Sequence, residues 1–120
     1  MSMALRTEDV DALLARACAL PGAEFDVKWE TRRVLSLERK MFALFHEDNV
    51  MYKVAADDFL VLSGLPGVRP APYLARARWI EVSSLEALSL EQLHAGIADA
   101  RRLVLAKLPK PVRQRYEASA

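Results

Sequence analysis

The stretch of sequence that decides the fold is residues 24–54, which read EFDVKWETRRVLSLERKMFALFHEDNVMYKV. Apolar and polar residues alternate along much of it, which is the pattern of β-strands with one buried face. Short polar runs at residues 38–40 and 47–49 are suited to hairpin turns. We therefore expect an antiparallel meander of four strands, near residues 25–30, 33–37, 41–45 and 50–54.

The first and third of these strands differ in pattern. Phe25, Val27 and Trp29 alternate with polar residues, which predicts a strand with one buried face. Residues 41–45 are apolar on both faces, which predicts a central strand covered on both sides.

A helix is expected before the meander, over residues 7–20. Thr7 is a suitable N-cap, acidic residues follow it in the first turn, and Pro21-Gly22 ends the helix. Cys18 lies within the apolar pattern, so we expect this single cysteine to be buried. One cysteine excludes an intramolecular disulfide and favours a reducing compartment.

After the meander, the sequence predicts a short helix over residues 56–63 and a fifth strand that begins at Trp79. Ser89, followed three residues later by Gln92, forms a capping box for a long helix that ends at Pro109. The order is α-β-β-β-β-α-β-α. We expect an α+β two-layer domain in which two long helices pack on an antiparallel sheet.

The chain of 120 residues fits one domain, which we assign to residues 1–110, and residues 111–120 are expected to be a frayed tail. With 52% hydrophobic and 28% charged residues, the composition is that of an ordinary globular protein. No apolar run is long enough to span a bilayer. We therefore expect a cytoplasmic, monomeric protein without membrane contact.

Most catalytic and cofactor sites are not indicated. His46 and His94 are the only histidines, and neither stands beside other residues at metal-ligand spacing. No glycine-rich turn of the Rossmann or P-loop kind is present. Adjacent acids such as Asp57-Asp58 stand where acids serve helix starts and solubility. We expect no metal, no cofactor and no enzyme activity.

Residues 66–79, PGVRPAPYLARARW, combine three prolines with arginines and aromatic rings. Proline fixes φ, so this segment is a stiff connection that holds its side chains at defined positions. The net charge is only +1, but residues 61–120 hold nine basic and five acidic residues. The second half therefore fits a modest positive face, although the same charges also fit an evenly mixed surface.

Cations and aromatic rings together suit a nucleic-acid surface, because cations meet phosphates and flat rings stack on bases. Each such residue also has an ordinary structural role. Trp29 and Trp79 fit core positions of strands, and lysines keep a sheet soluble. The candidate nucleic-acid-binding residues are Lys28, Lys40, Lys53, Arg69, Tyr73, Arg76, Arg78 and Trp79.

Several segments follow, in order and spacing, the pattern of one family. They are Pro21-Gly22, Asp26-Val-Lys-Trp29, Lys40-Met-Phe-Ala-Leu44, Lys53-Val54, residues 66–79 and Leu103-Val-Leu-Ala-Lys-Leu-Pro109. Over about residues 5–110 the chain resembles the MmcQ/YjbR-like proteins. The resemblance implies a CyaY-like (frataxin-like) α+β fold, also called a double wing, in small bacterial cytoplasmic proteins commonly described as DNA-binding. It brings no catalytic residues with it.

The chain departs from the family pattern at two places. Glu30 stands where many members have glycine, and Tyr73-Leu-Ala-Arg76 replaces a run whose His and Asn side chains can read base edges. The prediction is thus a non-enzymatic DNA-binding protein that contacts phosphates with little sequence specificity. The alternative is a protein-interaction or small-ligand-binding module that uses the proline-rich loop and Trp79.

Overall fold

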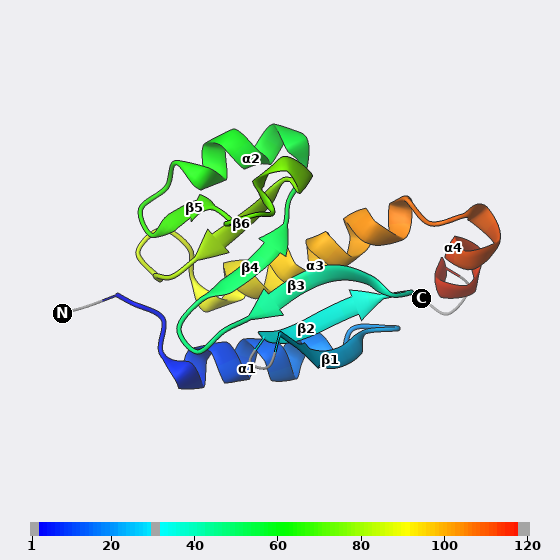
Figure 1. Ribbon diagram of the computed structural model, residues 1–120, viewed down its shortest axis with the longest axis horizontal. Coiled ribbons are helices and arrows are strands. Elements are labelled where there is room, and N and C mark those ends of the chain that lie inside the picture. Colours follow the sequence, from blue (N-terminus) through cyan, green and yellow to red (C-terminus); the bar gives the residue numbers. More distant parts are fainter. Residues whose placement is uncertain (1–2, 30–31, 118–120) are drawn as a thin grey trace.

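A six-stranded antiparallel sheet organises the molecule, in the order β1-β2-β3-β4-β6-β5 (Figure 1). The computed structural model describes residues 3–29 and 32–117. The elements are α1 (Thr7–Cys18), β1 (Glu24–Lys28), β2 (Arg32–Leu37), β3 (Lys40–Phe45), β4 (Val50–Lys53), α2 (Ala56–Ser63), β5 (Val68–Pro70), the short 3-10 helix η1 (Ala75–Ala77), β6 (Trp79–Val82), α3 (Leu90–Ala106) and α4 (Lys110–Glu117). The predicted α+β class and the four-stranded meander β1–β4 are confirmed.

The main core lies between one face of the sheet and the two long helices α1 and α3, which pack on each other (Figure 1). Val10 and Leu13 of α1 and Ile97 of α3 meet Leu35 and Phe45 of the sheet there, and all five are buried. The opposite face carries a smaller apolar cluster. Its buried members are Val34, Leu44, Met51, Ala71 and Trp79, with Met41 and Leu74 packed against them.

The two long helices begin with different caps. Ser89 and Gln92 form the predicted capping box of α3, in which each side chain accepts a hydrogen bond from the other residue's backbone N–H. Thr7 is not the N-cap of α1, because Arg6 occupies that position and the Asp9 carboxylate accepts the Arg6 backbone N–H at 3.0 Å. Cys18 is exposed at the end of α1, not buried as its apolar neighbours suggested.

The first strand does not bury the face that its alternation predicts. Phe25 stands opposite the core residue Leu35 and Val27 opposite the partly buried Arg33, yet Phe25 and Val27 are 53% and 50% exposed. β1 is an edge strand that pairs only with β2, so its side chains have neighbours on one side only. Trp29 follows the strand with a left-handed backbone (φ 52°) and is 65% exposed.

The proline-rich segment contains a strand that the sequence reading missed. β5 pairs with β6 alone and ends at Pro70, which is compatible with proline because an edge strand has unpaired donor positions. η1 and the residues before it then fold over the open face of the sheet and bring Leu74 against its apolar cluster.

The expected frayed tail is wrong for residues 111–117, which belong to α4. Pro111 stands in its first turn, where the missing N–H costs no helical hydrogen bond. Tyr116 fixes the helix: its hydroxyl donates to Glu38 at 2.5 Å and its ring packs against the main core beside Gly22. Residues 118–120 lie outside the described part of the chain.

Candidate functional site

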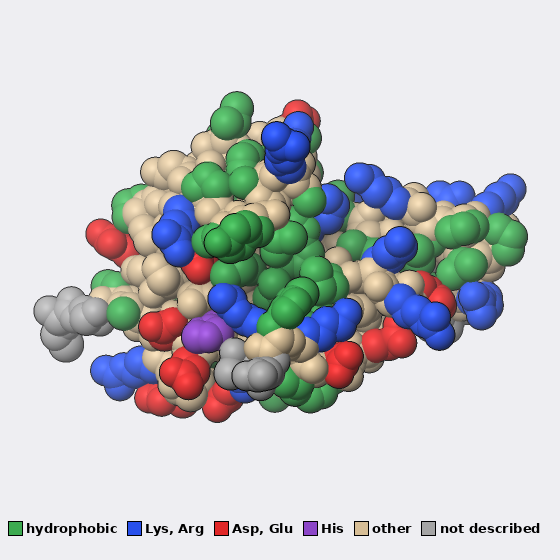
Figure 2. All heavy atoms as spheres, viewed as in Figure 1, with side chains coloured by type: hydrophobic (Ala, Val, Ile, Leu, Met, Phe, Trp, Pro, Cys, Tyr) green, Lys and Arg blue, Asp and Glu red, His purple; other side chains and the backbone are tan. Residues whose placement is uncertain are grey.

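The sheet face opposite α1 and α3 carries the candidate site. One row of directly paired residues crosses all six strands on this face: Asp26, Val34, Leu44, Met51, Glu81 and Arg69. The row is apolar in the middle and charged at both ends. Figure 2 looks onto this face and shows apolar side chains gathered at its centre with Lys and Arg side chains around them.

Two adjoining grooves lie on this face. The larger, called the cationic groove here, encloses about 580 Å³ and is lined by Lys28, Trp29, Arg39, Lys40, Met41, Lys53, Leu74, Ala77, Trp79, Val104, Lys107 and Leu108. The smaller, called the aromatic groove, encloses about 450 Å³ and is lined by Trp29, Arg32, Leu44, Met51, Pro72, Tyr73 and Leu74. The two grooves share Trp29 and Leu74, and none of these lining residues is acidic.

Lys53 lines both the cationic groove and a hollow beside it. It lies on β4 directly opposite Trp79 of β6, and its Nζ donates to the backbone carbonyl of Ala77 at 2.7 Å. Burial lowers the pKa of Lys53, and the nearby charges of Lys107 and Arg78 lower it further. The site thus holds a cation where positive charge is disfavoured, and a bound anion would relieve that.

A second pair of cations lies across the β1–β2 hairpin. Lys28 and Arg32 are directly opposed in the register, each lining one of the two grooves. Like charges that face each other across two strands destabilise the pair. Asp26 is the next residue along the same face of β1, and its carboxylate accepts the backbone N–H of Val27 at 2.8 Å.

The arginines that form ion pairs lie outside the two grooves. Six arginines pair with acids in the described part of the chain: Arg6, Arg16, Arg33, Arg69, Arg102 and Arg115. None of these ion pairs, which cover residues 3–29 and 32–117, includes a cation that lines the cationic or the aromatic groove. The described residues therefore leave the positive charge of the grooves without a salt-bridging carboxylate.

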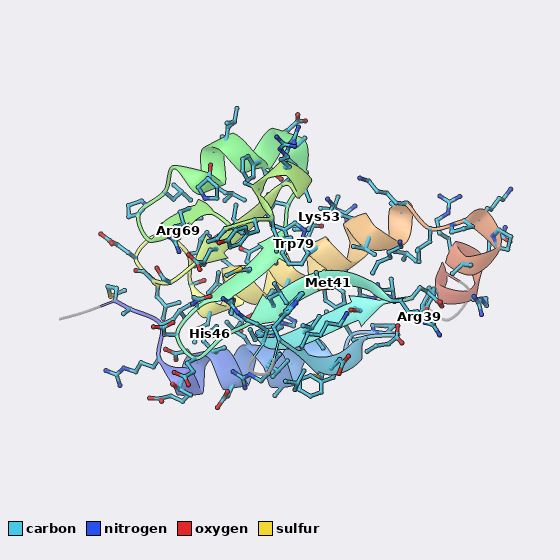
Figure 3. The ribbon with its side chains drawn as sticks, viewed as in Figure 1. Arg39, Met41, His46, Lys53, Arg69 and Trp79 are labelled. Carbon is cyan, nitrogen blue, oxygen red and sulfur yellow. The ribbon has the colours of Figure 1, made fainter. Side chains whose placement is uncertain are left out.

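The structure brings most of the predicted site residues together. Lys28, Lys40, Lys53 and Trp79 line the cationic groove, and Tyr73 lines the aromatic groove. Figure 3 shows Lys53, Trp79 and Met41 converging from three strands. Two further predicted residues, Arg76 and Arg78, line an adjacent hollow with Lys53 and Lys107.

Arg69 does not join this group. Its guanidinium forms an ion pair with Glu81, whose side chain is only 9% exposed. The hydrogen bond and the charge of Glu81 raise the pKa of Arg69 above its ordinary value. Arg69 thus serves to neutralise a buried carboxylate at the far side of the face from Lys53 (Figure 3).

Trp79 is placed in the site, but not as a stacking platform. It is 4% exposed and packs within the apolar cluster of the open face, so its ring forms the floor of the cationic groove. The accessible rings are Trp29 and the fully exposed Tyr73.

Sequence reasoning missed Arg32, Arg39 and Lys107 as lining residues, and it favoured a core position for Trp29. A first strand ending at Lys28 and a second beginning at Arg32 would have set these two cations opposite each other. Lys107 is separated from the other lining residues in sequence and reaches them only because α3 ends beside the sheet. Nothing in the sequence alone carried that information.

Two absences hold for the described residues. Between residues 3 and 29 and between 32 and 117, no three His, Cys, Asp or Glu side chains gather where a metal could bind. Within the same ranges, no helix has the length and apolar content that a membrane crossing requires.

Comparison with known proteins identifies the family. The chain matches the YjbR family over residues 18–103, and it belongs to that family. A crystal structure of a protein from Pseudomonas syringae, determined by the Northeast Structural Genomics Consortium, has the same fold, with a TM-score of 0.65 and 21% sequence identity. The match covers 78% of this chain and 96% of that one. No curated protein matches the chain.

Proposed function

We propose that this YjbR-family protein is a non-enzymatic DNA-binding protein that holds the phosphate backbone in the cationic groove. The observation that carries the proposal is a groove whose lining cations come from separate elements, with no acidic side chain among the described residues that line it. Lysines that have no carboxylate partner are free to exchange their counterions for phosphates. Because phosphates carry no base identity, such contacts give little sequence specificity.

The lowered pKa of Lys53 supports an anionic ligand. A phosphate close to Lys53 would favour its charged form and offset the repulsion from Lys107 and Arg78. Arg76 and Arg78 lie in the adjacent hollow and extend the positive lining along η1. DNA is a ligand that presents a row of phosphates to such a surface.

The first test is fluorescence anisotropy with labelled DNA over a series of salt concentrations. If about four phosphates are contacted, log affinity should fall against log salt with a slope of about −3 to −4. A flat salt response would contradict phosphate binding. Absence of binding even at low salt would contradict DNA binding altogether.

A matched pair of variants sharpens this test. Lys40→Gln combined with Lys53→Gln removes two groove cations, and Arg16→Gln combined with Arg102→Gln removes two paired cations outside the grooves. We expect the groove variant to bind DNA at least about tenfold more weakly with a shallower salt slope. The control variant should keep the DNA affinity and the salt slope of the natural protein. Equal losses in the two variants would show that only the total charge matters.

Small-ligand binding is a second candidate, favoured by the apolar lining of the aromatic groove. A protein-interaction module that uses the proline-rich loop and Trp79 has less support, because that ring is only 4% exposed. Displacement of labelled DNA by a free nucleotide at low concentration would favour the small ligand. Displacement by oligonucleotides alone would favour DNA.

A further inference from the structure

The aromatic groove has a chemistry that phosphate contacts do not use. The described residues that line it are Leu44, Met51, Pro72, Leu74 and two aromatic residues, with Arg32 as the single cation among them. A volume of about 450 Å³ lies within the roughly 300–1,000 Å³ typical of pockets for small organic groups. The groove is therefore suited to a flat apolar group that carries charge nearby.

The two aromatic residues of this groove are held in an unusual way. Trp29 and Tyr73 both have left-handed backbones, with φ of 52° and 65°, and both rings are largely or fully exposed. Bulky residues rarely adopt this conformation, and strained positions gather at functional sites. The backbone thus keeps two large rings in water at the edge of one groove.

We propose, building on the proposed function, that the aromatic groove takes an unpaired base of single-stranded DNA, which stacks on Trp29 or Tyr73. Stacking on aromatic side chains is tolerant of base identity because every base has a flat face. In a duplex, neighbouring base pairs cover those faces, and a base must leave the stack before it can enter a pocket. The protein therefore prefers single-stranded DNA to duplex DNA of the same sequence.

The shared lining of the two grooves connects base and backbone. Trp29 and Leu74 belong to both grooves, and the opposed cations Lys28 and Arg32 stand one in each. When a base lies in the aromatic groove, its own phosphate extends toward the cationic groove, and cations lie beside that phosphate. One strand occupies both grooves at once.

The test compares three probes at one salt concentration. They are a short single strand, the blunt duplex of the same length, and a single strand whose central bases are replaced by abasic sites. We expect the intact single strand to bind about tenfold or more tightly than either of the others, because only it supplies a free base. Equal binding of the intact and abasic strands would overturn the base-stacking proposal and leave phosphate binding standing. Binding of none of the probes would overturn the proposed function itself.

Variants locate the effect in the aromatic groove. Trp29→Ala and Tyr73→Gly should each weaken binding of the intact strand by about five- to a hundredfold. Tyr73 lines the aromatic groove and not the cationic groove, so Tyr73→Gly should leave binding of the abasic strand unchanged. Leu60→Ala is the matched control, because Leu60 is an apolar residue on α2 that is 81% exposed and lines neither groove. Loss of abasic-strand binding in Tyr73→Gly would contradict a role of Tyr73 in stacking.

Tryptophan fluorescence gives a direct readout of the same contact. Trp79 is buried, so the emission that changes on stacking belongs to the exposed Trp29. We expect the intact single strand to quench the tryptophan emission of the natural protein. The emission of Trp29→Phe, which comes from Trp79, should stay unchanged. Quenching that persists in Trp29→Phe would contradict a base beside Trp29.

Discussion

At the scale of single residues, Lys53 links the groove to pH. Its Nζ donates to the Ala77 carbonyl, forms no ion pair among the described residues, and lies near Lys107 and Arg78. Burial and these charges make the pKa of Lys53 lower in the folded protein than in the unfolded chain. Its charged form therefore opposes folding, and this cost disappears as pH rises through the lowered pKa. A phosphate bound beside Lys53 would instead stabilise the charged form of Lys53 and raise its pKa.

DNA affinity should therefore fall as pH rises through the pKa of Lys53, because binding must then return a proton to that side chain. Lys53→Arg should flatten this dependence, since arginine stays charged throughout. The measurement is anisotropy at constant salt from neutral pH to about pH 10. Parallel pH curves for the two proteins would contradict a phosphate contact at Lys53.

The two tryptophans show what single-residue patterns can and cannot predict. Both stand in alternating sequence and both fit a buried strand position, yet only Trp79 is buried. Trp79 begins β6, which has a partner on each side, whereas Trp29 follows the edge strand β1. Alternation predicts the period of a strand but not how many neighbours the strand has. That depends on the order of strands, which local sequence does not carry.

At the scale of elements, the fit of α3 to the sheet depends on Gly96. A Cβ added at this position would come within 2.8 Å of the Tyr52 ring and hydroxyl. Tyr52 is buried, and burial raises its pKa to about 12. The glycine thus lets the helix approach β4 closely.

Gly96→Ala should lower the free energy of unfolding, because overpacking costs about 1–3 kcal/mol while alanine regains about 1 kcal/mol of helix propensity. Gly64→Ala is the matched control. Its added Cβ would meet only backbone oxygens at 3.7 and 3.8 Å, so stability should stay or rise slightly. Urea denaturation of both variants measures the difference. A Gly96→Ala protein as stable as the natural one would contradict close packing of α3 on Tyr52.

Most elements were predictable from the sequence, and two of those that were missed, β5 and α4, have a common cause. The capping box at Ser89 and the hairpin turns of the meander are local signals, so these elements follow from neighbouring residues. β5 contains a proline and α4 has a polar sequence, so neither has a strong local pattern. β5 is held by pairing with β6 and α4 by Tyr116 on the core, which are contacts between distant residues.

At the scale of the whole molecule, the face proposed to bind DNA is also a source of instability. Arg39 lines the cationic groove and Arg78 lines the adjacent hollow, and both, like Trp29 and Tyr73, have a left-handed backbone. Arg78 also adds to the positive charge around Lys53. Strain and repulsion at one face are the cost that we expect of the proposed anion-binding site.

Arg78→Gly should change stability and DNA affinity in opposite directions. Glycine relieves the left-handed backbone, for which φ is 62°, and removes one charge beside Lys53. We expect the free energy of unfolding to rise by about 0.5–1 kcal/mol while DNA affinity falls severalfold. Arg76→Ala is the control, since Arg76 lies on η1 and does not have a left-handed backbone, so it should weaken binding without a gain in stability. A loss of stability in Arg78→Gly would contradict strain at this position. Thermal unfolding and anisotropy together measure both effects.

The cationic groove also has a consequence for the order of events during synthesis. Its lining runs from Lys28 on β1 to Leu108 beyond α3, and β6, which supplies its floor, pairs with the much earlier β4. The hairpins of β1–β4 are local and leave the ribosome first, whereas the groove needs nearly the last residues of the domain. A growing chain therefore completes the cationic groove only as the fold itself closes, so the proposed binding to nucleic acid could begin only after the domain has left the ribosome.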